Sequence, residues 1–278
     1  MDTVRDERWR YIGGSDIAAI MGISPFKTRF QLLQEKAQII EPDFKGNKYT
    51  EYGNVMEPKI RDYVNETLGR NFAPDVLMNG VFRFNLDGLD KECCDVLEIK
   101  TTSQIHGKPE DYKVYLVQLL PYMRMAGAVR GVLAVYQRPD DFDETFNPLL
   151  LTVHEVLIDD YSDLLEEIDT QVEIFKKDLE KLRENPFITE EELQPIEVVE
   201  YANKILALEQ QLESMKQLEK ELKSAKAELK RLMQENDVKK WITPNGTKIT
   251  LIPDGEDTIV SAFNEKKFAE EKPDMKNQ

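Results

Sequence analysis

The run Val96–Thr101 constrains the fold of this chain more than any other stretch, because it reads Val-Leu-Glu-Ile-Lys-Thr. Side chains of a strand alternate between its faces, so Glu98 and Lys100 point to one side while Leu97 and Ile99 point into a core. A carboxylate and an ammonium on an apolar strand are costly unless they are paired, hydrated or bound to a metal. The run therefore predicts either a metal site or a solvated sheet face.

An aspartate ends the preceding apolar run, eleven positions before Glu98. The segment 72–86 is extended and apolar, compatible with strands that lead into Leu86-Asp87-Gly88-Leu89. Carboxylate oxygens are the protein ligands that Mg²⁺ prefers, and Asp87 and Glu98 would supply two of them. We therefore expect a hairpin that brings two carboxylates together.

Composition limits the remaining classes of protein. The length of 278 residues fits one large domain or a core domain with an appendage. The composition, 41% hydrophobic and 32% charged, fits a soluble protein with a hydrophobic core. No apolar run approaches the ~20 residues of a membrane span, and the N-terminus lacks a signal-peptide pattern, so we expect a cytoplasmic protein without a membrane partner. The net charge of −16 argues against a surface coated in basic residues, but allows a DNA enzyme with a basic channel.

Histidine and cysteine usage excludes several kinds of site. His106 and His154 are the only histidines, so a multi-histidine zinc or iron site is impossible, and histidine-dependent nucleophilic catalysis has few candidates. Cys93 and Cys94 are adjacent, which suits neither a disulfide framework nor a CxxC metal site. We expect them to be small residues of a hairpin.

A candidate anion site lies near the N-terminus, where Gly13-Gly14-Ser15-Asp16 leads into a short apolar helix that ends at Gly22. We interpret Ser15 as the N-cap of this helix, and a second helix is expected over about 28–40. A helix N-terminus preceded by glycines favours negative charge. Arg8 and Arg10 lie just upstream and Lys27 just downstream, although a capped helix with solvated arginines is the alternative.

Two later helical patterns contain candidate polar residues. Pro58 is tolerated only in a first turn, so regular helix is expected to begin near it and to end at Gly69, with Glu57 at its start. A helix over about 110–126 places Gln118 on an apolar face. Without further information, Glu57 is as well explained by the helix dipole, and Gln118 by an ordinary hydrogen bond at the rim of a core.

The rest of the chain predicts the domain organisation. Strands over 131–137 and 149–157 would complete an α/β core with a mixed central sheet flanked by helices. Polar helices over 160–184 and 197–236 follow, and Asn245-Gly246 predicts a hairpin. The leucine-rich seam of the later helix breaks its heptad at Met215 and Leu218, which favours a local helical pair or arm. The expected domains are 1–158 (core), 159–238 (helical extension) and 239–278 (small β-hairpin and tail).

The aspartate followed at hairpin distance by Glu-x-Lys resembles the signature of the PD-(D/E)XK nuclease superfamily. The motifs Leu-Asp-Gly-Leu and Leu-Glu-Ile-Lys-Thr-Thr resemble those of one branch of this superfamily, the YqaJ-like viral recombinases, which are lambda exonuclease-like. Three further stretches support the resemblance: GGSDIAAIMGISPFKT from Gly13, Gly53-x-x-x-Glu57, and Tyr115-x-x-Gln118. The resemblance implies a restriction-endonuclease-like core and a metal-dependent deoxyribonuclease.

The resemblance also implies roles for individual residues. Asp87, Glu98 and the backbone C=O of Ile99 would bind two Mg²⁺ ions, with Mn²⁺ as the alternative, while Lys100 would orient or deprotonate the attacking water. Glu57 and Gln118 would line the catalytic centre. The 5′-phosphate of DNA would be held by Ser15, by Arg8 or Arg10, and by Lys27. Related enzymes carry a further metal-ligand carboxylate upstream, whereas this chain has Leu77 there and Asp75 as the nearest acid.

The implied activity is digestion of double-stranded DNA ends from 5′ to 3′, leaving 3′ single-stranded overhangs. Such overhangs imply a single-strand DNA annealing protein as partner, in phage or prophage recombination within a bacterial host cytoplasm. A homo-oligomer, with a trimer as one form, is also implied. The alternatives are an endonuclease or nickase of the same fold, and a catalytically degenerate recombination scaffold.

Overall fold

The computed structural model describes residues 8–42, 46–251 and 259–262. The chain divides into two compact units, residues 1–193 and 194–278, and each is described by itself.

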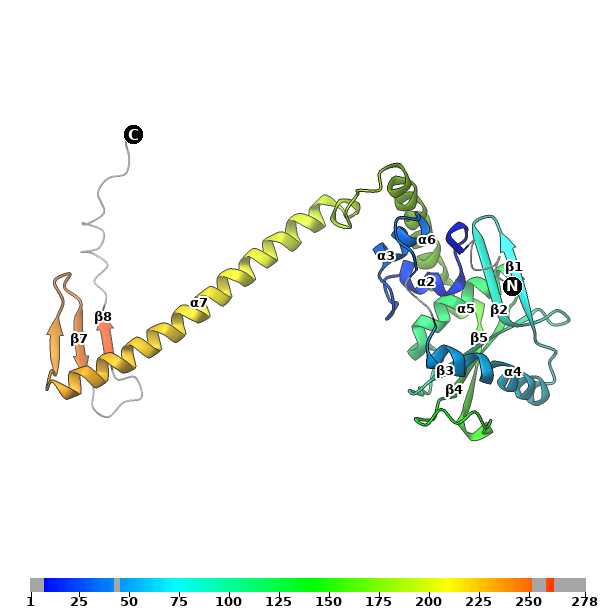
Figure 1. Cartoon of the computed structure of the whole chain (residues 1–278), viewed down its shortest axis with the longest axis horizontal. Coiled ribbons are helices and arrows are strands. Elements are labelled where there is room, and N and C mark those ends of the chain that lie inside the picture. The colour runs from blue at the N-terminus through cyan, green and yellow to red at the C-terminus, as the bar shows by residue number, and fades with distance from the viewer. Residues whose placement is uncertain (1–7, 43–45, 252–258, 263–278) are drawn as a thin grey trace. The chain divides into compact units, whose positions relative to one another are not determined.

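The first unit is built on a five-stranded sheet with the order β1-β2-β3-β4-β5 (Figure 1). The strands are β1 (Ala73–Asn79), β2 (Phe82–Asp90), β3 (Asp95–Thr102), β4 (Arg130–Gln137) and β5 (Leu151–Leu157). Only β3 and β4 are parallel, and the other neighbours are antiparallel. The predicted α/β core with a mixed central sheet is confirmed.

The helices of this unit surround the sheet. They are α2 (Gly14–Ile20), α3 (Arg29–Lys36), α4 (Lys48–Leu68), α5 (Lys113–Ala126) and α6 (Ser162–Glu184). Short 3₁₀ turns lie at Arg8–Arg10, Pro109–Tyr112, Pro148–Leu150, Ile158–Tyr161 and Glu191–Leu193. Helix α6, assigned above to the helical extension, packs in one apolar cluster with α2 and α3 and so belongs to the first unit.

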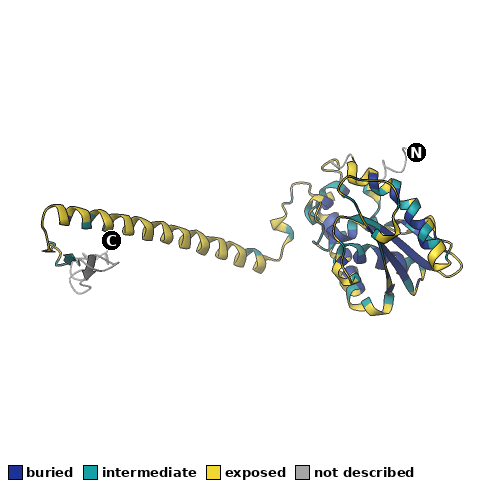
Figure 2. Ribbon diagram, turned by 90° about the horizontal axis from the view of Figure 1, so that it is seen from below, coloured by how far each residue is buried: buried dark blue, intermediate teal, exposed yellow. Residues whose placement is uncertain are grey.

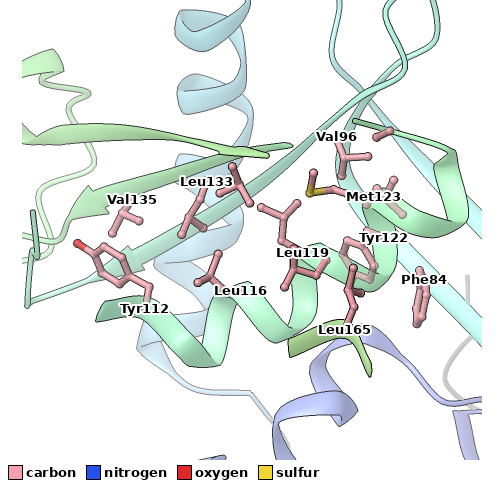
Figure 3. Close-up of a cluster of buried hydrophobic side chains, with 14 residues drawn as sticks. Phe84, Val96, Tyr112, Leu116, Leu119, Tyr122, Met123, Leu133, Val135 and Leu165 are labelled. Carbon is pink, nitrogen blue, oxygen red and sulfur yellow. The ribbon is translucent and has the colours of Figure 1, made fainter. Parts of the chain in front are cut away.

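Two helices bury opposite faces of the central strands. On one face, α5 packs against β3 and β4 through Leu116, Leu119, Met123, Val96, Leu133 and Val135 (Figure 3). On the other, α4 packs against the same strands through Tyr52, Met56, Ile60, Leu97, Ile99 and Val132. Strands β3 and β4 are therefore covered on both faces, which leaves little room for water around the Glu98 side chain at the middle of β3.

Helix α4 begins ten residues earlier than the sequence suggested, at Lys48, so the predicted start near Pro58 is wrong. The Asn47 side chain caps the first turn by accepting hydrogen bonds from the backbone N–H groups of Tyr49 and Thr50. Pro58 lies within the helix, on its exposed side. Packing of the apolar face of α4 therefore outweighs the cost of one proline.

The two N-terminal helices also differ from expectation. The N-cap of α2 is Gly13 and not Ser15, because the Asp16 carboxylate already accepts a hydrogen bond from the Gly13 N–H at 2.8 Å. Ser15 is thus a helical residue with an exposed side chain. Helix α3 stops at Lys36 instead of continuing to 40, since Gln38 takes a left-handed conformation with φ of 61°.

The second unit contains a long helix and a small sheet. Helix α7 (Ile196–Glu235) precedes β6 (Lys240–Ile242), β7 (Lys248–Leu251) and β8 (Ile259–Ala262), which pair antiparallel in that order. The hairpin predicted at Asn245-Gly246 is confirmed, whereas the sequence did not predict β8. Figure 2 shows that α7 is exposed along nearly its whole length, in contrast with the buried strands of the first unit.

Within the described ranges, we find no helix with the length and apolar character needed to cross a membrane.

Candidate active site

Glu98 is the most deeply buried charged group of the site, with an exposed fraction of 0%. It lies on β3, on the face covered by α5, and its carboxylate forms an ion pair with the Lys100 ammonium. Neither of its oxygens accepts a hydrogen bond of normal geometry, although Oε1 contacts the ammonium. The solvated sheet face, offered above as an alternative, is therefore wrong.

The burial of Glu98 changes its protonation. Loss of hydration raises the pKa of the Glu98 carboxyl to about 8, and the negative charges of Asp87 and Glu57 act in the same direction, while Lys100 opposes them. Lys100 shows the converse behaviour, since burial lowers its pKa but the attraction of Glu98 and Asp87 raises it overall. Lys100 is consequently a firmly protonated ammonium beside a carboxyl that is easily protonated.

Asp87 lies at an irregularity of β2. Ala73 of β1 pairs with Leu89, but Asp75, two residues later, pairs with Leu86, so β2 contains one extra residue at Asp87-Gly88. Such a bulge redirects a side chain, and these irregularities are frequent next to active sites. Here the Asp87 Oδ2 atom accepts a hydrogen bond of 2.8 Å from the Ile99 backbone N–H, which fastens Asp87 to β3.

Glu57 reaches the same centre from α4 and is held by an arginine that the sequence analysis missed. Arg61 donates from two nitrogens to Glu57 Oε1, at 3.0 and 3.1 Å, and also donates to the Asp87 carbonyl at 2.9 Å. Partial burial and the charge of Asp87 raise the pKa of Glu57, against the opposing effects of Arg61 and Lys100. The spacing of Glu57 and Arg61 predicts only an ordinary helical ion pair, because the contact with Asp87 is not visible in the sequence.

The residues of this centre fit a divalent cation. Among the described residues, the buried Glu98 carboxylate contacts only Lys100, through Oε1, so its Oε2 atom has no partner. Asp87 likewise has one oxygen besides the one that accepts from the Ile99 N–H, and these two oxygens could bind a cation. The set is small, because no group of three or more histidine, cysteine, aspartate or glutamate side chains is placed to hold a metal in the part of the chain that the structure describes. Leu77 packs against the apolar core and Asp75 pairs with Lys91, so neither adds a ligand.

A second feature is a polar pocket of about 160 Å³, which lies beside α2 and α5 and is open to solvent. Its lining comes from the N-terminal segment (Arg8, Tyr11, residues 13–16 and Lys36), from β2 (Arg83 and Asn85) and from α5 (Gln118 and Tyr122). Of the residues that the resemblance assigns to the phosphate, Ser15 and Arg8 line this pocket. Gln118, assigned to the catalytic centre, lines it as well.

The other two predicted phosphate ligands lie elsewhere. Lys27 forms an ion pair with Glu35, and the Arg10 guanidinium lies 5.3 Å from the centre of the Trp9 ring. Neither residue is part of the pocket lining. Arg83, Asn85 and Lys36 line the pocket but were not predicted, because isolated polar residues in a strand or at a helix end resemble ordinary surface positions.

Tyr122 lies between the pocket and the cluster of Asp87, Glu98 and Lys100. Its hydroxyl accepts a hydrogen bond of 3.0 Å from the Gln118 side-chain amide, and its ring lies directly against Gly14, where a Cβ atom would be 2.0 Å from the hydroxyl oxygen. Burial raises the pKa of Tyr122 well above its usual range, and the charges of Glu98, Asp87 and Asp16 add to this. The pocket and the carboxylates therefore lie within electrostatic reach of the same side chain.

The fold class is mixed α/β, with a five-stranded sheet flanked by helices. Asp87, Glu98 and Lys100 lie within electrostatic reach of one another on this sheet, and Glu57 reaches them from a helix. Residues 4–129 match the model of the YqaJ-like viral recombinase domain.

Individual relatives are more distant. An uncharacterized protein of Mycoplasma genitalium, MG373, is 34% identical over 64 residues, which are 23% of this chain and only 22% of that relative. The phage related exonuclease from Haemophilus somnus 129PT gives a TM-score of 0.49 at 17% identity, over 62% of this chain and 94% of the other. The alkaline exonuclease LHK-Exo from Laribacter hongkongensis gives 0.46 at 18% identity, over 73% and 96%.

Proposed function

We propose that this protein is a metal-dependent deoxyribonuclease. The observation that carries the proposal is the fully buried Glu98 carboxyl group, whose described contact is the Lys100 ammonium and which lies within the field of Asp87. A buried ionisable group of this kind is costly to the fold, so it is most simply explained by a function that requires it. The YqaJ-like domain match supports the same class of activity.

Each residue has a distinct part in the proposed hydrolysis. Asp87 and Glu98, with the Ile99 carbonyl, would hold Mg²⁺ or Mn²⁺, one or two ions, and the ion would activate water and stabilise charge on the phosphate. Lys100, kept protonated by its carboxylate neighbours, orients the water and stabilises negative charge rather than acting as the base. Arg61 holds Glu57 and the Asp87 backbone in place.

The polar pocket supports an end-dependent reaction. Ser15 and Arg8 line it within reach of Tyr122, whose pKa responds to the catalytic carboxylates. A terminal 5′-phosphate bound there would set the polarity as 5′ to 3′ on double-stranded DNA and leave 3′ overhangs. Such a product requires a single-strand DNA annealing protein as partner, in the bacterial cytoplasm during phage or prophage recombination. Arg10 and Lys27 lie outside the pocket lining and are the weaker candidates for phosphate binding.

Substitution of the central residues tests the activity. Asp87→Asn, Glu98→Gln and Lys100→Met should each lower kcat on linear duplex DNA with Mg²⁺ roughly a thousandfold, because each removes several kcal/mol of transition-state stabilisation. Glu155→Gln is the matched control, since it neutralises an exposed glutamate on β5 of the same sheet. The measurement is release of acid-soluble nucleotide, with circular dichroism to verify the fold.

Two outcomes would contradict the proposal. If Glu98→Gln digests DNA at the wild-type rate, Glu98 has no catalytic role. If the folded wild-type protein digests no DNA, the recombination scaffold is favoured. A covalently closed circular duplex separates the remaining alternatives, because an exonuclease leaves it intact whereas an endonuclease or nickase cuts it.

A further inference from the structure

Arg83 is a cationic side chain of the polar pocket, and the protein does not supply acceptors for all of its N–H groups. It extends from β2, and its Nε atom is buried without a hydrogen-bond partner. None of the described carboxylates pairs with its guanidinium. A guanidinium has five N–H donors and is always charged, so a buried and unpaired nitrogen is costly unless a ligand supplies the acceptor.

The neighbouring lysine, in contrast, has no donor left for a ligand. Lys36 is buried, and its ammonium contacts the Asp16 carboxylate at 2.6 Å and the carbonyls of Arg8 and Tyr11 at 2.9 and 2.6 Å. An ammonium has three N–H donors, so these contacts account for all of them. The ion pair with Lys36 offsets the negative charge of Asp16, which would otherwise repel an anion from the pocket. Lys36 is therefore a positioning residue of the N-terminal segment.

The backbone holds Arg83 against the segment that carries the other pocket residues. The Arg83 N–H donates to the Ile12 carbonyl at 3.1 Å, and the Ile12 N–H donates to the Val81 carbonyl at 2.7 Å. These bonds fasten the start of β2 to the residue that precedes Gly13-Gly14-Ser15. The guanidinium and the exposed Ser15 hydroxyl consequently line the pocket from two segments joined by backbone hydrogen bonds, so little ordering remains for ligand binding.

We propose that Arg83 is the specificity-determining residue that recognises a terminal phosphate monoester in this pocket, together with Arg8 and Ser15. This inference rests on the proposed function and assigns a role to a residue that the family motifs do not include. The planar guanidinium matches phosphate oxygens in a bidentate manner. A terminal phosphate carries more negative charge and one more free oxygen than an internal diester, so Arg83 discriminates an end from the interior of a strand.

The experiment compares duplexes that differ only in a 5′-phosphate or a 5′-hydroxyl end. Binding is measured by fluorescence anisotropy with EDTA present, so that no strand is cut, and hydrolysis is measured separately with Mg²⁺. Wild-type protein is expected to bind the phosphorylated end more tightly by roughly tenfold to a hundredfold, the range for one charged hydrogen-bonding group. Arg83→Gln is expected to abolish that preference and to bind the hydroxyl end as the wild type does, whereas Arg83→Lys restores part of the preference.

Arg124→Gln is the matched control, since it removes the same charge from an exposed ion pair with Asp169 and should keep the full preference. The inference is overturned if Arg83→Gln retains the preference, or if it weakens both ends equally, as a merely structural residue would. Failure of the proposed function has a different signature, because a protein that binds phosphorylated ends selectively but hydrolyses neither duplex keeps the pocket and lacks the nuclease.

Discussion

Burial determines the behaviour of Glu98, which lies between two apolar layers and shares its space with Lys100. A carboxyl that holds its proton to about pH 8 releases it when a divalent cation binds, because the cation requires the ionised form. We therefore expect metal binding at the proposed site to depend on pH over the physiological range.

We expect the affinity for Mg²⁺ to rise up to about tenfold per pH unit between pH 6 and 8, since one proton is displaced. The stability of the metal-free protein changes with pH in the opposite direction. The folded state retains a proton on Glu98 that the unfolded chain loses near pH 4.5, so the free energy of unfolding falls as pH rises from 4.5 to about 8. The slope from this group is at most about 1.4 kcal/mol per pH unit.

Titration calorimetry with Mg²⁺ in buffers of different ionisation enthalpy measures the released proton, and denaturant unfolding of the metal-free protein measures the slope. Glu98→Gln should abolish the proton release and flatten the stability profile, while Glu155→Gln should leave both unchanged. Proton release that persists in Glu98→Gln would assign the coupling to another group.

The clustering of Asp87, Glu98 and Lys100 could be predicted because their pattern is local: they lie within one hairpin and one strand. Arg61 and Arg83 could not be predicted, since their roles depend on contacts with residues far away in the sequence, such as Asp87 for Arg61 and Ile12 for Arg83. Nothing in the sequence around an arginine indicates which distant backbone it will meet.

At the scale of elements, the contact between α2 and α5 joins the polar pocket to the face of the sheet that carries Glu98. Gly14 of α2 lies directly on the Tyr122 ring of α5, and Tyr122 in turn receives the hydrogen bond of Gln118. The sequence predicted both helices, but it attributed the glycine pair to an anion-binding turn. The structure shows that one of the two glycines is required for close packing of a buried tyrosine.

Gly14→Ala should therefore destabilise the protein by about 1–3 kcal/mol, the usual cost of overpacking, and should also impair activity because Tyr122 must move. Gly107→Ala is the matched control, since no atom lies within 4 Å of its added Cβ. Thermal or urea unfolding gives the stability, and the duplex digestion assay gives the activity. Unchanged stability of Gly14→Ala would show that the α2–α5 contact is looser than the structure indicates.

The extent of α4 illustrates why element boundaries were harder to predict than element identity. The proline rule placed the start of the helix near Pro58, yet the apolar residues Tyr52 and Met56 already belong to the face that packs on the sheet. A local rule considers one backbone hydrogen bond, whereas the observed start at Lys48 reflects the burial of several side chains.

At the scale of the whole molecule, α7 differs from the rest of the chain in both exposure and charge. Within its own unit, its apolar seam is exposed at Ile205, Leu208, Leu212, Met215, Leu218 and Leu222, each at least half exposed. The chain has a net charge of −16, but the helix contains eight acidic and seven basic residues and is nearly neutral. Two copies of this helix would not repel each other strongly, and burial of each leucine contributes about 1.5–3 kcal/mol.

We therefore expect α7 to mediate a homo-oligomer through its seam, as a helical pair limited by the broken heptad between Met215 and Leu218. Leu212→Asp should lower the molar mass measured by light scattering or sedimentation equilibrium, since a carboxylate in a helical seam cannot be hydrated. Leu206→Asp makes the same change at an exposed position beside the seam and should keep the wild-type mass.

If the wild-type protein and Leu212→Asp have equal mass at every concentration, the seam does not bind a second copy and serves another partner. If the mass falls while digestion per protomer is unchanged, assembly and catalysis are separate properties of the two units.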